Sequence, residues 1–144
     1  MYIEECSAEE LLSKLNELDE CDAIEAKAYS TDSSRTLLET VCSMSNEPGL
    51  GGGVILLGIA ENNAEVKDAS GKRYFVEGVD DPDTAQLDLV TQCKSVFNSP
   101  VYPTVKVEKV HGKTVLKIIV DELPHHENHY ISRKRDCRRA HTVA

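Results

Sequence analysis

Apolar residues recur every three or four positions in three stretches of the chain, and each stretch predicts a helix. The first helix is expected over about residues 8–18. Ser7 and Glu10 precede its apolar positions as a capping box, in which each side chain accepts a hydrogen bond from the other residue's backbone N–H. The third helix is expected to begin at Asp81, since a capping aspartate and a proline in the first turn are both favoured there. The apolar positions that mark the second and third helices are Leu37, Leu38, Val41, Cys42 and Met44, then Leu87, Leu89, Val90, Cys93, Val96 and Phe97.

Alternating and continuous apolar segments predict the strands. Residues 23–29 alternate, so Glu25 and Lys27 point to the same face of a half-exposed strand. The run at 54–59 is apolar throughout, which predicts a central strand of a sheet. The other predicted strands are 73–76, 105–110, 114–120 and a short edge strand at 130–131, with His111 and Gly112 turning a hairpin between the two longer ones.

The order of these elements indicates the fold class. It reads α-β-α-β-β-α-β-β, without the regular alternation of a βαβ repeat. The order predicts an α+β fold in which helices pack on a mixed sheet as two layers. The length of 144 residues predicts a single domain, residues 1–144, that can bury a sizeable core without disulfides.

The charge of the chain is acidic overall and unevenly distributed. The formal net charge is −9, which argues against a uniformly basic nucleic-acid binder. Residues 1–25 carry nine acids against one base, whereas residues 133–139 carry five bases against one acid. Because binding follows the local field rather than the total charge, the basic segment keeps nucleic acid among the expected partners.

The expected location is the cytoplasm, with no membrane partner. No segment reaches the ~20 apolar residues of a membrane span, and the sequence after Met1 has neither a basic region nor an apolar signal core. A zinc ribbon or a redox pair has no support, because no Cys-x-x-Cys occurs. We expect free, buried thiols at the five cysteines, which are Cys6, Cys21, Cys42, Cys93 and Cys137.

Three carboxylates could meet at one edge of the predicted sheet. Glu25 and Lys27 share one strand, Glu20 lies at or before its start, and Glu61 follows the end of the 54–59 strand. If the two strands are neighbours, the carboxylates could hold Mg²⁺ or Mn²⁺ and activate water for phosphodiester cleavage, with Lys27 beside them as a further catalytic candidate. The alternative is an ion pair between Glu25 and Lys27 with a structural role only. No other cofactor is expected.

Two segments are candidates for contact with nucleic acid. The backbone N–H groups of Gly51, Gly52 and Gly53 could contact a phosphate. Their structural alternative is a helix C-cap and a flexible connection, since a helix, and not a strand, comes before these glycines. The second segment is a basic tail, which could instead pair with the acidic N-terminal segment, within one chain or between protomers of a dimer. Its members are Arg133, Lys134, Arg135, Arg138 and Arg139.

The ordered set of motifs resembles the Schlafen AlbA-type domain (AlbA_2). The resemblance covers nearly the whole chain, from about Glu20 to Thr142. It rests on Glu25-x-Lys27, a helix ending near Asn46, the glycines before a Gly58-Ile59 strand end, Gly78-Val79-Asp80-Asp81-Pro82, the hairpin at 105–120, and the closing Cys137-Arg138-Arg139-Ala140-His141-Thr142.

The resemblance implies a DNA- or RNA-binding module of transcriptional-regulator-like proteins, at the N-terminus of a longer chain. In catalytic Schlafen domains three acids act at a metal, and the matching positions here are Glu20, Glu25 and Glu61, the last of which is an aspartate in that family. Three functions therefore compete: binding without catalysis, which we favour, metal-dependent RNA cleavage, and a structural or oligomerisation role. The sequence does not distinguish DNA from RNA.

Overall fold

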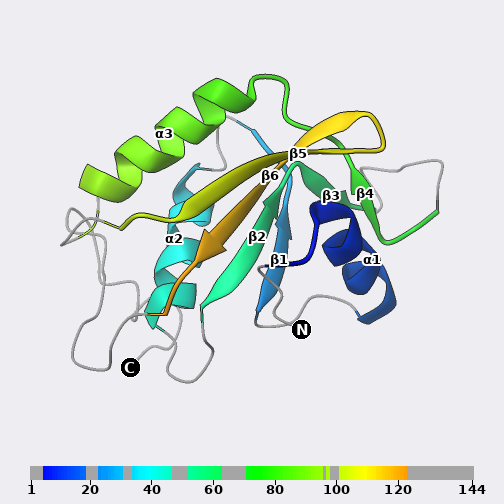
Figure 1. Cartoon of the computed structure of the whole chain (residues 1–144), viewed down its shortest axis with the longest axis horizontal. Helices are drawn as coiled ribbons and strands as arrows, with labels where there is room; N and C mark the ends of the chain where they lie inside the picture. Colours follow the sequence, from blue (N-terminus) through cyan, green and yellow to red (C-terminus); the bar gives the residue numbers. More distant parts are fainter. Residues whose placement is uncertain are drawn as a thin grey trace.

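The computed structural model describes residues 5–18, 23–30, 34–46, 52–62, 71–95, 97 and 101–122. The predicted α+β fold class is confirmed, whereas the predicted strand at 130–131 lies outside the described residues. Figure 1 shows the elements, which are α1 (Ala8–Leu18), β1 (Ile24–Lys27), α2 (Ser34–Asn46), β2 (Gly53–Leu57), β3 (Ile59–Glu61), β4 (Tyr74–Val76), α3 (Pro82–Ser95), β5 (Thr104–Val110) and β6 (Lys113–Val120).

A four-stranded mixed sheet, in the order β1-β2-β6-β5, forms the centre of the fold. β1 and β2 run parallel, and β6 runs antiparallel to both β2 and β5. β2 is buried along its whole length, as its unbroken apolar sequence predicts. The predicted hairpin of β5 and β6 is confirmed. Its turn residues His111 and Gly112 have φ values of 51° and 80°, and positive φ at both central positions is what a type I′ turn requires.

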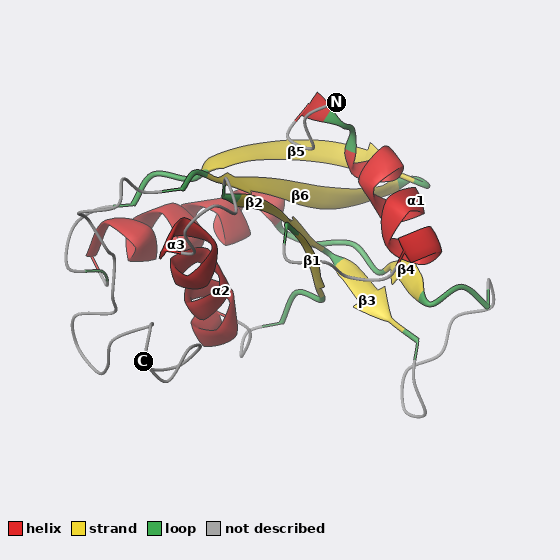
Figure 2. Ribbon diagram, turned by 90° about the horizontal axis from the view of Figure 1, so that it is seen from below, coloured by secondary structure: helices red, strands yellow, loops and turns green. Residues whose placement is uncertain are grey.

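Helices cover both faces of this sheet, as Figure 2 shows. α2 and α3 pack on one face, where Leu89 and Ile55 belong to one buried cluster. α1 packs on the other face together with the two-stranded sheet of β3 and β4, and there Leu11, Tyr74 and Leu56 are buried together. Neighbouring residues of β2 therefore serve opposite cores, because side chains alternate along a strand.

The apolar run at 54–59 forms two strands, and the prediction of one continuous strand is wrong. Gly58 separates the two with a φ of 108°, which residues with a side chain rarely adopt. A Cβ at Gly58 would also lie 3.1 Å from a methyl carbon of Val79. The chain turns at this glycine, and β3 leaves the main sheet to pair antiparallel with β4.

The predicted starts of the first and third helices are confirmed by their hydrogen bonds. The N–H of Glu10 donates to Oγ of Ser7 at 3.2 Å, and the N–H of Ser7 donates to Oε1 of Glu10 at 3.1 Å. At the start of α3 the carboxylate of Asp81 accepts the backbone N–H of Thr84 at 3.2 Å and its hydroxyl at 2.7 Å. In both caps, the side chain accepts a hydrogen bond from a backbone N–H group of the first turn that has no partner inside the helix.

α3 leaves one predicted core position at the surface. Leu87 is 66% exposed. It falls outside the stripe that faces the sheet, and the helix buries Ala85, Leu89 and Cys93 instead.

The cysteines follow the expectation in part. Cys6 and Cys93 are free and buried, and burial raises the pKa of the Cys93 thiol to about 12. Cys42 is disulfide-bonded, so the expectation of a free thiol there is wrong. Spacing along the chain does not show which cysteines the fold brings together. Cys21 and Cys137 lie outside the described residues.

A buried ion pair anchors the start of α1 to the sheet, and no sequence pattern pointed to it. Lys117 on β6 is only 3% exposed. Its Nζ donates to the carbonyl oxygen of Cys6 at 2.7 Å and lies 3.5 Å from Oε2 of Glu108. The other carboxylate oxygen of Glu108 accepts the N–H of Ala8 at 2.9 Å. Glu108 therefore satisfies a further free N–H of the first turn, two residues before the N–H of Glu10 that Ser7 satisfies.

Candidate nucleic-acid interface

Glu25 and Lys27 lie side by side on β1, at one end of the strand order of the main sheet. The register places them beside Ile55 and Leu57, so they share the face that α2 and α3 cover. Nζ of Lys27 lies 3.7 Å from Oε2 of Glu25, and the two side chains are 19% and 34% exposed. The ion pair expected as the structural alternative is therefore present. Oε2 of Glu25 is nevertheless buried and accepts no hydrogen bond from the described residues.

Glu61 ends β3, and its carboxylate is bound by Arg73. Two nitrogen atoms of Arg73, Nε and Nη2, each lie 2.8 Å from Oε2 of Glu61. The guanidinium of Arg73 also lies over the ring of Tyr74, 5.4 Å from its centre. Glu61 is opposite Tyr74 on the β3–β4 ladder and shares its side of that small sheet. Glu25 and Glu61 thus belong to different sheets and lie next to opposite cores.

The described residues supply only part of the predicted metal site. Glu20 lies outside them, so the trio of Glu20, Glu25 and Glu61 stays a prediction. Within the described part of the chain, no three Asp, Glu, His or Cys side chains are placed to hold one ion. Glu25 fits a metal ligand in one respect, because its buried Oε2 accepts no hydrogen bond, although Nζ of Lys27 lies 3.7 Å from the same atom. Glu61 fits less well because Arg73 neutralises its charge.

Close packing explains two glycines of the cluster before β2. A Cβ on Gly52 would collide with the carbonyl oxygen of Val120, and one on Gly53 would lie 2.6 Å from the sulfur of Met44. Gly52 also has a φ of 82°. Both glycines are buried, which favours their structural role. Gly51 lies outside the described residues, and phosphate contact by these glycines stays a prediction.

The structure reveals a basic region that the sequence reasoning missed. The predicted basic tail, Arg133 to Arg139, lies outside the described residues. Within them, exposed lysine and arginine side chains gather on the segment that leads into β4 and on the β5–β6 hairpin. The members of this basic side are Lys72, Arg73, Lys106 and Lys113, whereas Lys109 points to the opposite face of the hairpin. A signal was present in the sequence, since residues 104–117 hold four lysines and one histidine against a single acid.

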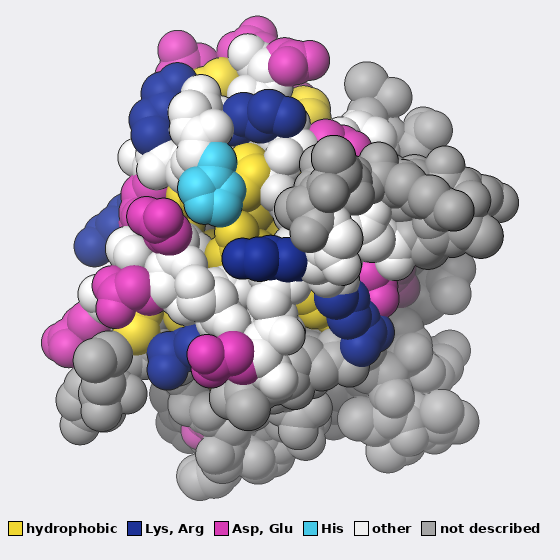
Figure 3. Space-filling view, turned by 90° about the vertical axis from the view of Figure 1, so that its right-hand side faces the viewer, with side chains coloured by type: hydrophobic (Ala, Val, Ile, Leu, Met, Phe, Trp, Pro, Cys, Tyr) yellow, Lys and Arg dark blue, Asp and Glu magenta, His cyan; other side chains and the backbone are white. Residues whose placement is uncertain are grey.

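The two segments of the basic side meet at the hairpin turn. Nζ of Lys113 lies 3.5 Å from the carbonyl oxygen of Val76 at the end of β4. Figure 3 looks onto this part of the molecule, where dark blue Lys and Arg side chains lie among magenta Asp and Glu side chains and around a few hydrophobic ones. Lys72, Arg73 and Lys113, which come from distant parts of the chain, therefore lie near one another, and Lys106 points to the same face of the hairpin as Lys113.

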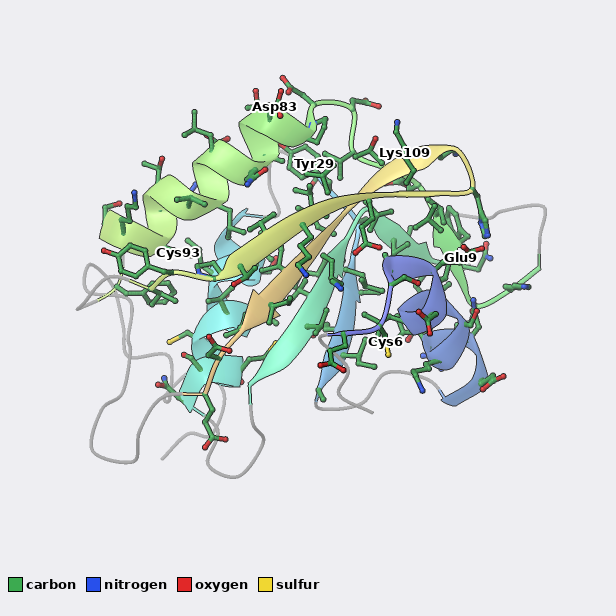
Figure 4. All side chains as sticks on the ribbon, in the orientation of Figure 1. Cys6, Glu9, Tyr29, Asp83, Cys93 and Lys109 are labelled. Carbon is green, nitrogen blue, oxygen red and sulfur yellow. The ribbon has the colours of Figure 1, made fainter. Side chains whose placement is uncertain are left out.

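Acidic side chains gather around the start of α3. Figure 4 labels Asp83 there and Lys109 on the hairpin. Hydrogen bonds from the hydroxyl and the backbone N–H of Thr84 lower the pKa of Asp81 from its ordinary value of 3.8, so that this carboxylate stays ionised at neutral pH. The exposed acids of this group, with no lysine or arginine between them, are Glu77, Asp80, Asp81, Asp83 and Asp88.

The fold defines an α+β domain in which several exposed cations gather beside α1 and the hairpin, with Glu9 and Glu61 among them, and acids gather at the start of α3. The profile of the family described as "Schlafen, AlbA_2" matches residues 20–142. The chain belongs to this family, and the predicted resemblance is confirmed over almost the same residues.

Two solved structures are similar to this chain. One is the N-terminal domain of a protein from Nitrosomonas europaea related to the ATP-dependent DNA helicase RecG. It has 39% sequence identity, a TM-score of 0.72, and coverage of 85% of this chain and 77% of that one. The other, the DIP2311 protein from Corynebacterium diphtheriae, shares the fold at 21% identity and a TM-score of 0.53, over 80% of this chain and 20% of that one. No curated protein matches the chain.

A membrane-spanning helix was not expected. No helix in the described ranges is long and apolar enough to cross a membrane. The cytoplasmic location stays a prediction.

Proposed function

We propose that this domain binds nucleic acid within a transcriptional-regulator-like protein, with its basic side against the phosphates. The observation that carries the proposal is the gathering of exposed cations on one side of a chain whose net charge is −9. Neutralising phosphates with lysine and arginine supplies most of the affinity of such domains. The acidic start of α3 would be repelled by the same phosphates, which would orient the domain on a strand.

The relatives support the same class of function. The family is nucleic-acid related, and the name of the Nitrosomonas europaea neighbour refers to a DNA helicase. That neighbour is similar over most of both chains. The predicted tail would extend the basic side, and its residues are Arg133, Lys134, Arg135, Arg138 and Arg139.

The proposal is tested by fluorescence anisotropy with labelled single-stranded RNA, single-stranded DNA and duplex DNA. Affinity should fall as salt rises from about 50 to 200 mM, because binding releases counterions. Lys106→Glu combined with Lys113→Glu, two lysines on the same face of the hairpin, should weaken all sequences alike and flatten the salt dependence. Lys94→Glu is the matched control, since Lys94 is an exposed lysine in the last turn of α3.

Two results would contradict the proposal in different ways. If the wild-type domain binds no strand even at low salt, the domain is not a nucleic-acid binder. If it binds, but the double variant binds as tightly as the Lys94→Glu control, the basic side is not the interface. Arg138→Glu with Arg139→Glu would then show whether the tail carries binding instead.

RNA cleavage is a second candidate, favoured by one observation. The buried Oε2 of Glu25 accepts no hydrogen bond from the described residues, which suits a cation ligand. A bound Mg²⁺ or Mn²⁺ would supply an activated water. Incubating labelled structured RNA with and without Mn²⁺ tests this. Cleavage that needs Mn²⁺ and is lost in Glu25→Gln, but not in Glu39→Gln, would support a nuclease, and intact RNA would exclude it.

The structural alternative predicts a salt-dependent oligomer. If acidic and basic segments of two protomers pair, the mass measured by light scattering should fall from dimer to monomer as salt rises. A constant monomer mass at low and high salt would remove this alternative.

A further inference from the structure

A hollow of about 430 Å³ lies between α1, β4 and the hairpin turn. Its volume falls within the range of about 300–1,000 Å³ that ligand sites occupy. Lys72, His111 and Lys113 line it with nitrogen donors, and α1 contributes Glu9 and Ser13. Three segments that are far apart in the sequence therefore build one polar site, on the face shown in Figure 3.

The floor of the hollow is held in a fixed position. The side-chain amide of Asn16 on α1 makes two hydrogen bonds with the backbone of Tyr74. Its Nδ2 donates to the carbonyl oxygen of Tyr74 at 3.1 Å, and its Oδ1 accepts the N–H of Tyr74 at 2.8 Å, as the backbone of a neighbouring strand would. α1 is thereby joined to β4. The apolar part of the lining comes from Leu12 and Val76, which are 5% and 8% exposed. The hollow thus offers only a small apolar surface beside its cationic side chains, to which the half-buried Phe75 also contributes.

His111 occupies a backbone conformation that few residues adopt without cost. Its φ is 51°, and it is the only described residue other than glycine with positive φ. Asn-Gly would suit this type I′ turn better than His-Gly. A residue held at positive φ is a candidate for a function. Nε2 of His111 lies 3.7 Å from Oε1 of Glu9, and both residues line the hollow.

A second hollow of about 500 Å³ continues from the first. The two share Ser13, Asn16 and Lys72, and the second adds Glu17, Gly71 and Arg73. Together they form a groove along α1 and not a closed chamber. A groove of this shape suits a chain-like ligand better than a small molecule.

We propose that this groove binds a single strand of nucleic acid, with one unpaired nucleotide in the 430 Å³ hollow. Lys113 and Lys72 would neutralise its phosphate, and the apolar floor would contact the base. A duplex would bind less tightly, because a paired base must first be unpaired and flipped out of the stack before it can enter the hollow. The inference rests on the proposed function and adds to it a preference for single strands and a location.

The test compares His111→Asn/Lys113→Met with wild type in anisotropy titrations of single-stranded and duplex oligonucleotides. Asparagine suits the turn and methionine keeps the packing of the lysine stem, so the unfolding midpoint should not fall. Single-strand affinity should fall at least about tenfold, the loss expected for one charge-assisted hydrogen bond. Duplex affinity should fall no more than it does in Lys106→Met, a hairpin lysine that does not line the hollow.

The failures of the two proposals are distinguishable. If the wild-type domain binds single strands and the double variant matches Lys106→Met, the groove inference is overturned and the proposed function stands. If no strand binds but AMP or UMP shifts the amide signals of Ser13 and Lys72, both fall and the hollow is a small-molecule site. If neither strands nor mononucleotides bind, both proposals are wrong.

Discussion

Replacing Lys117 by methionine should lower the free energy of unfolding by about 2–4 kcal/mol. The substitution removes the ammonium group that lies 2.7 Å from the carbonyl oxygen of Cys6 and 3.5 Å from the carboxylate of Glu108. Methionine has a similar length and keeps the apolar packing of the stem. The predicted loss therefore reports the polar contacts and not a cavity.

The size of this loss of stability follows from how deeply Lys117, the carbonyl group of Cys6 and the carboxylate of Glu108 are buried. A buried carbonyl that loses its donor costs about 1–3 kcal/mol. Breaking a fully buried ion pair by removing one partner costs about 3–5 kcal/mol. Glu108 keeps 26% side-chain exposure, so water replaces part of what it loses, and the total belongs at the lower end of that range. At roughly 2–4 °C per kcal/mol, the unfolding midpoint should fall by roughly 5–15 °C.

Urea unfolding followed by circular dichroism measures the change, and a double-mutant cycle isolates the pair. Glu108→Gln keeps an acceptor for the N–H of Ala8 and removes only the charge. The double variant should cost less than the sum of the single variants by more than about 0.5 kcal/mol, since residues in direct contact are coupled. Lys106→Met is the matched control, because Lys106 is exposed and lies opposite Lys117 on the β5–β6 ladder.

A change in the free energy of unfolding of no more than about 0.5 kcal/mol in Lys117→Met, as a surface substitution would give, would show that the buried polar contacts of Lys117 do not stabilise the fold. Additive effects of the two substitutions would also contradict the prediction, because the cluster would then not act as a unit.

Three further predictions concern single positions. Gly52→Ala should destabilise the domain by at least about 1 kcal/mol more than Gly112→Ala in urea unfolding, because both have positive φ but only a Cβ at Gly52 meets other atoms; equal costs would refute the packing argument. Cys93, whose pKa is raised to about 12 by burial, should resist iodoacetamide in the folded protein and react only on unfolding, as judged by mass spectrometry; rapid labelling of the folded form would contradict this. The backbone N–H of Ser7, and to a smaller extent its hydroxyl, lower the pKa of Glu10 from 4.5. The stabilisation by the Glu10 carboxylate is therefore complete at pH values above its pKa in the unfolded chain, and it is lost as pH falls through its lower pKa in the folded protein. Unfolding midpoints from neutral pH to below 4.5 should therefore fall more steeply for wild type than for Glu10→Gln.

The parts of the candidate site were predictable to different degrees. The Glu25–Lys27 pair follows from strand alternation alone and is present. The partner of Glu61 was not predictable, because Arg73 reaches it only after Gly58 turns the chain into a second sheet. The basic side was missed because its lysines alternate with apolar residues in the hairpin and form no run in the sequence.

The sequence by itself determined what depends on neighbours in the chain. The caps at Ser7 and Asp81, the buried central strand and the hairpin each arise from residues within a few positions of one another, where backbone geometry leaves little choice. The tertiary structure alone decided what depends on distant contacts. Lys117 meets a carbonyl 111 positions away, and Asn16 joins a strand 58 positions away. Such pairs leave no periodic signal, because burial and partner choice depend on how whole elements pack.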